Sequence, residues 1–242
     1  MSADMGRCGK RGAKMAGESS AQEAANESAA GEKGRAYHHG RLRQALLAAA
    51  RALISERGPS GFTLAEAAKR VGVTGAAPYR HFADRNALMS ALAQEGFEHF
   101  NQQLGKAWDG GRPDPVTALR RRGAAYLAFA KNEPGLYRAM FGDAGFLTQP
   151  AANAAAQKAF DELIRTTVAV LRHFCAPEQN ARTLAVQIWA MTHGVAQLML
   201  AGHFTADEKE AGQVLEDAVA ALVEGAIRQA LGVKQVFPRP AE

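Results

Sequence analysis

The sequence predicts an all-α fold, with an N-terminal three-helix domain followed by a C-terminal helical bundle. Alanine is abundant, aromatic residues make up only 7% of the 242 residues, and glycine and proline punctuate the chain without dominating it. Apolar residues recur at spacings of three and four, which is the pattern of helices that bury one face. Because a chain of this length can bury a sizeable core, we expect two folded domains, over 37–95 and 96–242.

Residues 1–36 differ in composition from the rest of the chain. They are rich in Ala, Gly, Ser, Glu and Lys and carry almost no large apolar side chains. Such a segment buries too little surface to offset the entropy of ordering, so we expect a disordered tail. A solubilising tail is favoured, since the acidic residues argue against a simple basic arm, and binding along DNA phosphates is the alternative.

The first helix is expected from Gly40 to about Glu56, and Gly58-Pro59 ends it. One face of this segment is apolar, at Leu42, Leu46, Ala49, Ala50 and Leu53. That face is expected to pack on the helices that follow, as in a small three-helix domain.

A short helix is expected to start at Thr63. Thr63 and Glu66 form the pattern T-x-x-E, in which each side chain caps an amide at the start of a helix. Gly72 ends this helix, because glycine tolerates the left-handed backbone of a C-terminal cap.

A second helix is expected after the Gly-Val turn, with Thr74 as its N-cap, and it runs through Tyr79 and Phe82. Asp84 caps a third helix. Two short helices joined by a glycine turn form a helix-turn-helix, whose second helix enters the major groove of DNA. Pro78 fits that second helix only if the helix begins late or irregularly, because proline lacks the N–H group.

Positive charge is concentrated on this domain. The net charge of the chain is +5; Lys and Arg outnumber Asp and Glu by 8 to 4 over residues 37–95 and balance them at 15 to 15 over 96–242. A polyanionic partner needs such a local excess, because counterion release supplies most nonspecific affinity. A solvated basic face is the alternative, but it does not predict the coincidence with the helix-turn-helix. We therefore expect binding to double-stranded DNA.

The segment over 37–92 resembles the DNA-binding domain of the TetR (tetracycline-repressor-like) family. The resemblance rests on a Gly-Val turn, a Tyr-x-His-Phe ending and a basic residue after it, which are Gly72, Val73, Tyr79, His81, Phe82 and Arg85. It implies that Tyr79, His81 and Arg85 contact phosphates, which suits groups that donate hydrogen bonds.

The residues expected to contact DNA lie at the start of the first helix and along the helix-turn-helix. They are Arg41, Arg43, Thr63, Lys69, Thr74, Gly75, Ala76, Ala77, Tyr79, Arg80, His81 and Arg85. Residues 75–78 offer no side-chain hydrogen bond to a base. Recognition is left to thymine methyl groups, close approach of backbone, Lys69 or Arg80 reaching from the flanks, and DNA shape.

The second domain is expected to consist of helices over 116–131, 134–141, 151–174, 178–201 and 207–231. The last two carry broad apolar faces. In the TetR family the last two long helices form the dimer interface, so the resemblance implies a homodimer. Completion of an intramolecular bundle is the alternative.

Trp189, His193 and Gly194 resemble the Trp-x-x-x-His-Gly signature of one class of TetR C-terminal domains. Trp189 and His193 share a helical face, because they are four residues apart. With Tyr137 and Phe141 they are candidates to line an apolar ligand pocket with one polar anchor. A core histidine with satisfied hydrogen bonds, and a glycine that permits close helix packing, are the alternatives.

Several functions are excluded by what the sequence lacks. It has no Gly-rich phosphate loop, nucleophile motif or clustered carboxylates, so neither an enzyme nor a cofactor is expected. Its two cysteines show no metal or redox spacing, so no metal site is expected. Without a membrane-length apolar run or a signal peptide, a cytoplasmic location is expected.

The sequence therefore predicts a homodimeric transcriptional regulator. The simplest form is a repressor that a small-molecule effector releases from a near-palindromic operator. An effector-independent architectural or division-control protein of the same fold is the alternative.

Overall fold

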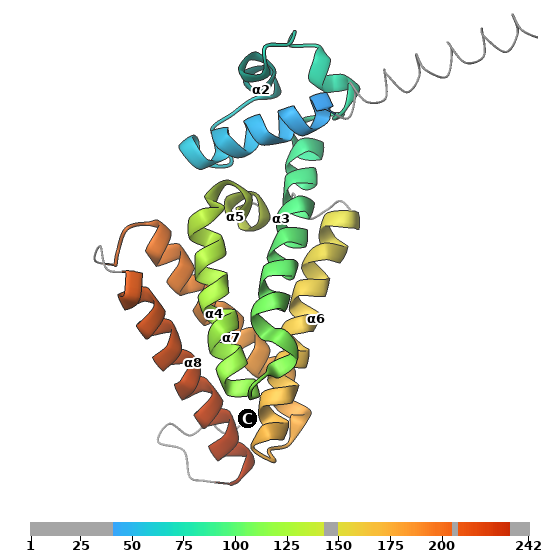
Figure 1. Cartoon of the computed structure of the whole chain (residues 1–242). Coiled ribbons are helices and arrows are strands. Elements are labelled where there is room, and N and C mark those ends of the chain that lie inside the picture. The colour runs from blue at the N-terminus through green and yellow to red at the C-terminus, as the bar shows by residue number, and fades with distance from the viewer. Residues whose placement is uncertain (1–40, 143–149, 205–207, 233–242) are drawn as a thin grey trace, which may run out of the picture. The chain divides into compact units, whose positions relative to one another are not determined.

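The computed structural model describes residues 41–142, 150–204 and 208–232 (Figure 1). These residues form helices and no strand, which confirms the all-α prediction. Contacts between Cα atoms divide the chain into two units, Met1–Leu46 and Leu47–Glu242. The expected tail over 1–36 lies outside the described residues. No helix in the described ranges is long and apolar enough to cross a membrane.

The first helix covers 41–57, close to its predicted bounds. Helix α2 (Leu64–Val71) begins as predicted: Oγ1 of Thr63 accepts a hydrogen bond from the amide of Glu66, and the Glu66 carboxylate accepts one from the amide of Thr63. Gly72 ends α2 with φ of 80°, in the left-handed region that favours glycine. Thr63, Glu66 and Gly72 thus have the capping roles that the sequence indicates.

The second helix of the helix-turn-helix is shorter than predicted. It is a single 3-10 turn, η1 (Ala77–Arg80), and Ala76, not Thr74, precedes it. The prediction of Thr74 as the N-cap is therefore wrong. The reason is Pro78, which is buried and lacks an N–H group, so a longer helix cannot run through it. The carbonyl of Thr74 instead accepts a turn hydrogen bond of 3.0 Å from the amide of Ala77.

Helix α3 (Arg85–Trp108) is capped by Asp84, whose carboxylate accepts a 2.7 Å hydrogen bond from the amide of Ala87. The short turn η2 (Asp109–Gly111) ends it. Within the described residues five α-helices follow, with η4 (Glu178–Asn180) before the fourth of them: α4 (Pro115–Asn132), α5 (Pro134–Phe141), α6 (Pro150–His173), α7 (Ala181–Leu200) and α8 (Glu208–Ala230). All five were predicted, and the largest shift is the start of α7, because residues 178–180 form η4.

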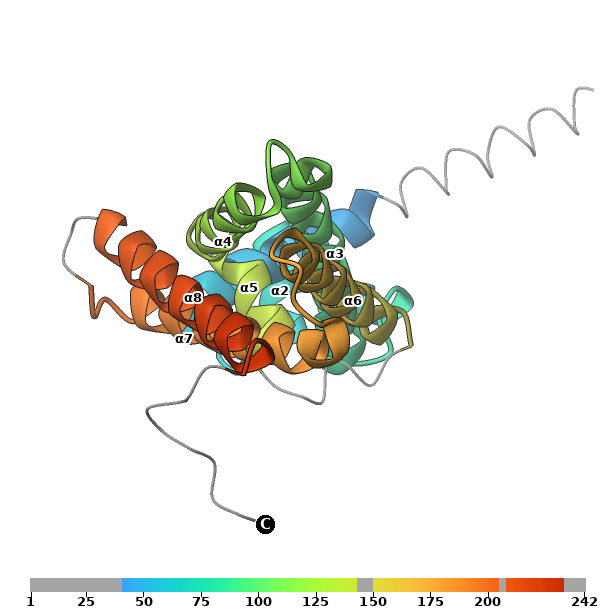
Figure 2. The ribbon, with the colours of Figure 1, turned by 90° about the horizontal axis from the view of Figure 1, so that it is seen from below.

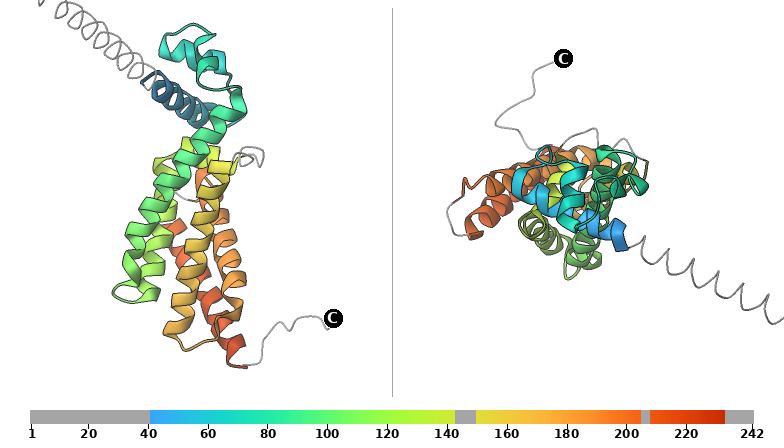
Figure 3. Two further views of the ribbon diagram at one scale, coloured as in Figure 1. Left: turned by 90° about the vertical axis from the view of Figure 1, so that its right-hand side faces the viewer. Right: turned by 90° about the horizontal axis from the view of Figure 1, so that it is seen from above.

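The helices that follow α2 pack as a bundle within the second unit. Helix α3 packs against α4, α5 and α6, and α7 packs between α6 and α8. Figure 2 shows α7 and α8 side by side, and Figure 3 shows α3 beside α6. Aromatic rings fill the space where α3, α4 and α5 meet, with Phe100 edge-on to both Tyr126 and Phe129. A cluster of buried apolar side chains joins α4, α6, α7 and α8; it includes Leu119, Val170, Leu184 and Val223.

Candidate DNA interface and effector cavity

The helix-turn-helix carries exposed side chains suited to contact phosphate. The phenol ring of Tyr79 is 60% exposed. Lys69 and Arg80 are also exposed, and no hydrogen bond or ion pair ties either side chain to another described residue. Two cations and one phenol are therefore available on this surface for charge-assisted hydrogen bonds to DNA.

The other predicted contacts of the turn differ in exposure. Thr74, Gly75 and Ala76 are exposed, whereas Ala77 and His81 are half-buried. A Cβ atom at Gly75 would meet nothing within 4 Å in this chain. Close packing inside the protomer therefore does not explain this glycine, whereas a backbone that approaches another molecule would.

Thr63 and Arg85 are engaged inside the domain. The Thr63 hydroxyl lies within the capping box of α2, 3.1 Å from the Glu66 carboxylate. The guanidinium of Arg85 donates to the carbonyls of Phe62 and Pro59 and lies 5.0 Å above the Phe62 ring. In this structure Arg85 holds the loop before α2, in addition to standing at the start of α3 where the resemblance places a phosphate contact.

Two ion pairs hold α2 against the end of the first helix. Arg70 lies 2.5 Å from Glu56, and Arg57 lies 2.9 Å from Glu66. Both pairs are largely exposed, so each contributes little to stability. The hydrogen bonds from the Thr63 amide and hydroxyl, followed by the Arg57 contact, lower the pKa of Glu66. Because Arg70 is paired with Glu56, its positive charge is locally balanced, whereas Lys69 has no ion pair with another described residue.

Arg41 and Arg43 lie in the first unit, at the start of the first helix, and both are exposed. Their phosphate contacts remain predictions.

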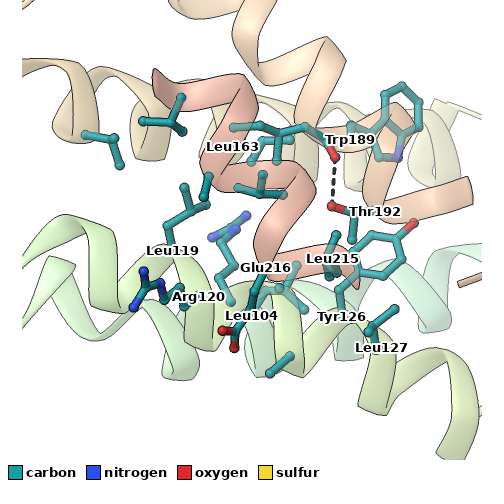
Figure 4. A pocket seen from close by; sticks show the side chains of 18 of the residues that line it. Leu104, Leu119, Arg120, Tyr126, Leu127, Leu163, Trp189, Thr192, Leu215 and Glu216 are labelled. Carbon is teal, nitrogen blue, oxygen red and sulfur yellow. Dashed lines mark hydrogen bonds between the residues drawn. The ribbon is translucent and has the colours of Figure 1, made fainter. Parts of the chain in front are cut away.

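A cavity of about 760 Å³ lies within the bundle, between α3, α4, α6, α7 and α8. Figure 4 shows leucine side chains around it, among them Leu104, Leu119, Leu163 and Leu215, with Arg120 and Glu216 toward one side. Thr192 lines it as well, but its hydroxyl is used in a 2.7 Å hydrogen bond to the Ile188 carbonyl. The size and the apolar walls are those of a site for a small organic molecule.

The four predicted ligand residues divide into two pairs. Phe141 and Trp189 line the cavity. Tyr137 and His193 lie behind its wall, where the Tyr137 hydroxyl is 2.9 Å from Nδ1 of His193. They reach the cavity through Tyr126, which lines it and whose hydroxyl is 3.1 Å from the same nitrogen. His193 is thus part of a hydrogen-bonded cluster rather than a lining residue.

Burial keeps this cluster uncharged. It lowers the pKa of His193, raises the pKa of Tyr137 to about 12 and raises that of Tyr126 well above its usual value. For Tyr126 the neighbouring Tyr137 adds to the effect of burial. At neutral pH two phenol hydroxyls and a neutral imidazole therefore share one network.

Helix α5 connects this cluster to the first helix. The Arg138 guanidinium donates a 2.7 Å hydrogen bond to the carbonyl of Ser55, and Glu133 forms an ion pair with Arg51. Gly135 lies so close to the Arg51 carbonyl that a Cβ atom there would clash with it. One short helix thus contacts the first helix with one face and carries Tyr137 and Phe141 toward the cavity.

Two residues of this region were missed from sequence, Arg122 and Tyr126. Arg122 lies in the run Arg120-Arg121-Arg122, which reads as a solvated charged face, yet it is buried and lines the cavity. A usable signal was its spacing, because it stands three residues after Leu119 and four before Tyr126, on the apolar face of α4.

An apolar surface remains uncovered on α7 and α8. Its large side chains are between 38% and 48% exposed: Val186, Trp189, Met191, Leu198 and Val214. Gly194 lies on the same helix, and a Cβ atom there would meet nothing within 4 Å. Exposed apolar side chains on two adjacent helices are candidates for a protein interface.

Comparisons with protein families match both parts of the chain. The model of bacterial regulatory proteins of the tetR family matches residues 46–92. The model of the tetracyclin repressor-like C-terminal domain matches residues 119–222. These ranges contain, respectively, the helix-turn-helix and most of the cavity wall.

Curated relatives include the nucleoid occlusion factor SlmA of Vibrio cholerae, 35% identical over 104 residues that make up 43% of this chain and 53% of the relative. SlmA of Photobacterium profundum is 30% identical over 132 residues, which are 54% of this chain and 67% of the relative. The chain thus spans between about half and two thirds of the length of these relatives.

Solved structures share the fold. A protein of unknown function from Rhodococcus sp. RHA1 is 27% identical with a TM-score of 0.66, over 79% of this chain and 98% of that one. A TetR-like transcriptional regulator from the same organism is 22% identical with a TM-score of 0.60, over 76% of this chain and 96% of that one.

Proposed function

Because the chain belongs to the TetR family of bacterial regulatory proteins, we propose that it is a homodimeric repressor released from its operator by a small-molecule effector. Proteins of this family bind DNA, form dimers and are regulators, not enzymes. The observation that carries the proposal is the contact of α5 with both the cavity wall and residues 51–55 of the first helix. The proposed place of action is the cytoplasm.

In the proposed complex the protein contacts DNA phosphates more than bases. Tyr79, Lys69 and Arg80 supply exposed donors, and the short turn η1 presents backbone and methyl groups to the groove. Two copies would place these turns in successive major grooves, about 34 Å apart, on a near-palindromic operator. Specificity then depends on backbone approach and DNA shape.

The proposed dimer forms through the uncovered apolar surface of α7 and α8. A second copy would cover Val186, Leu198 and Val214, and Gly194 would permit close approach of the two α7 helices. Burial of these side chains supplies the hydrophobic driving force for association.

The proposed release works through α5. A molecule in the cavity contacts Phe141 and Tyr126, and Tyr126 shares its hydrogen bonds with Tyr137 on α5. A shift of α5 then reaches the first helix through Arg138 and Glu133. The effector acts by binding more tightly to the dimer geometry that fits the operator poorly.

The test combines footprinting with salt dependence. A dimeric regulator is expected to protect two half-sites one helical turn apart and to lose affinity steeply as salt rises. A monomer with no measurable DNA affinity at low salt would contradict the proposal.

A second candidate is an effector-independent role in chromosome organisation. It is supported by the relatives, which are nucleoid occlusion factors. Genome-wide binding separates the two: one or a few promoters favour regulation, whereas many scattered sites favour this second role.

A further inference from the structure

Arg122 is a buried cation in the wall of the cavity. It lies on α4 and is only 5% exposed. Its side chain lines this cavity and also a second, smaller cavity between α3 and α6. Among the residues that the structure describes, no hydrogen bond or ion pair engages its guanidinium. Its burial is therefore unusual, because buried guanidinium groups in proteins are almost always paired.

The carboxylate that favours the charged form of Arg122 already forms an ion pair with another residue. Glu162 is the carboxylate whose charge favours the protonated guanidinium, but Glu162 forms an ion pair of 2.6 Å with Arg165. Desolvation lowers the pKa of Arg122 to about 10, so the side chain stays charged at neutral pH. The cavity wall thus holds a full positive charge, and no carboxylate among the described residues forms an ion pair with it.

The remaining charges along the cavity are exposed. They belong to Arg120, Glu216, Glu224 and Arg228, all in contact with solvent. The buried hydroxyls are occupied, since Thr192 bonds the Ile188 carbonyl and Tyr126 lies within hydrogen-bond distance of His193. Of the described lining residues, Arg122 alone combines charge with burial, and its fork of donors suits a planar carboxylate.

We infer that the cavity takes an apolar molecule with one carboxylate, whose head group pairs with Arg122 while its hydrocarbon part fills the space between the leucines. The inference rests on the proposed function, since it names the chemical class of the proposed effector. A carboxylate would supply the missing counterion, and the apolar walls would bind the chain through the hydrophobic effect.

The test uses matched probes with the full chain: dodecanoate, dodecanol and dodecylamine. Fluorescence of Trp189, which lines the cavity, reports occupancy without DNA; Trp108, the other tryptophan, is replaced by Phe in every protein compared. Dodecanoate is expected to bind at least about tenfold more tightly than dodecanol, as one charge-assisted hydrogen bond allows, and dodecylamine more weakly than either.

Three variants complete the test. Arg122→Gln should remove the preference for dodecanoate over dodecanol, Arg122→Lys should restore part of it, and the matched exposed change Arg121→Gln, outside the cavity lining, should leave it unchanged. Circular dichroism confirms that each variant is folded. Equal binding of dodecanoate and dodecanol would overturn the inference, and so would an unchanged preference for dodecanoate in Arg122→Gln. An equal loss of this preference in Lys158→Gln would also overturn it, because it would place the head group in the smaller cavity.

The outcome for operator binding separates this inference from the proposed function. If dodecanoate binds through Arg122 but leaves the affinity for DNA unchanged, the carboxylate site stands and effector-controlled repression fails. If another apolar molecule without a carboxylate fills the cavity and releases DNA while dodecanoate does not bind, the repressor stands and the inference fails.

Discussion

The hydroxyl of Tyr137 lies 2.9 Å from Nδ1 of His193, and the two rings are stacked with centroids 5.7 Å apart. This contact joins α5 to α7 directly behind the cavity wall. Because α5 also holds Ser55 through Arg138, the pair stands between the proposed effector site and the first helix of the DNA-binding region. We expect changes to this pair to affect release more than DNA binding itself.

Replacing Tyr137 with Phe removes the hydroxyl and keeps the ring. We expect the free energy of unfolding to fall by about 1 kcal/mol, the typical net contribution of one hydrogen bond. DNA affinity without effector should stay within about twofold, while the effector concentration needed for release changes. Urea unfolding and operator titrations measure the two effects. The exposed change Tyr79→Phe is the matched control and should leave stability unaltered; a variant with unchanged stability and unchanged release would contradict the role of Tyr137.

The lowered pKa of His193 predicts a pH dependence of stability. Burial disfavours its charged form in the folded state, so the unfolded chain takes up a proton at a higher pH, near the ordinary value of 6.5. The free energy of unfolding should therefore decrease as the pH falls below about 6.5, down to the lowered pKa of the folded state. His193→Gln should lose this part of the slope. Urea unfolding across that range is the measurement, and an identical slope in both proteins would refute the prediction.

Lys69 and Arg80 are expected to contribute to DNA affinity through phosphate contacts. Replacing either with Gln should weaken binding to all sequences alike and reduce the slope of log affinity against log salt by about 1. Arg70→Gln is the matched control, because Arg70 is paired with Glu56 and should change the slope less. Fluorescence anisotropy at several salt concentrations measures the slope. A larger effect from Arg70→Gln than from the other two changes would contradict phosphate contacts by Lys69 and Arg80.

Arg85 is expected to act on stability first. Arg85→Met removes hydrogen bonds to the carbonyls of Phe62 and Pro59, which should lower the free energy of unfolding by about 2 kcal/mol. Arg80→Met, an exposed change of the same kind, should have little effect on stability. If Arg85→Met unfolds like the unaltered protein but loses DNA affinity, its main role is the phosphate contact that the family resemblance implies.

Gly194 is expected to matter for association and not for the protomer fold. A Cβ atom there meets nothing in this chain, so Gly194→Leu should leave helix content unchanged but weaken the dimer. Ala128→Leu, at an exposed position of α4, provides the control. Sedimentation velocity gives the oligomeric state, and a fully dimeric Gly194→Leu would place the interface elsewhere.

Much of the fold could be predicted because its signals are local. The capping box of Thr63 and Glu66, the left-handed Gly72 and the Asp84 cap depend on residues within one helical turn, and the structure has all three. The second helix of the helix-turn-helix was predicted too long. There one local property, the missing N–H of Pro78, outweighed the pattern around it.

The site was only partly predictable because burial and pairing depend on residues far apart in the sequence. Phe141 and Trp189 line the cavity, whereas His193 is tied to tyrosines 56 and 67 residues away. Arg122 was missed because its two arginine neighbours are exposed, and its burial depends on helices that are far away in the sequence and pack around α4. The predicted DNA contacts remain predictions.

The central claim is that occupancy of the cavity controls the grip on DNA. The most direct measurement titrates dodecanoate into the full chain bound to its footprinted operator, with Trp189 fluorescence and DNA anisotropy recorded in the same sample. We predict that loss of DNA follows filling of the cavity with the same midpoint, and that Arg122→Gln shifts both curves together. A cavity that fills while the operator stays bound would contradict the account.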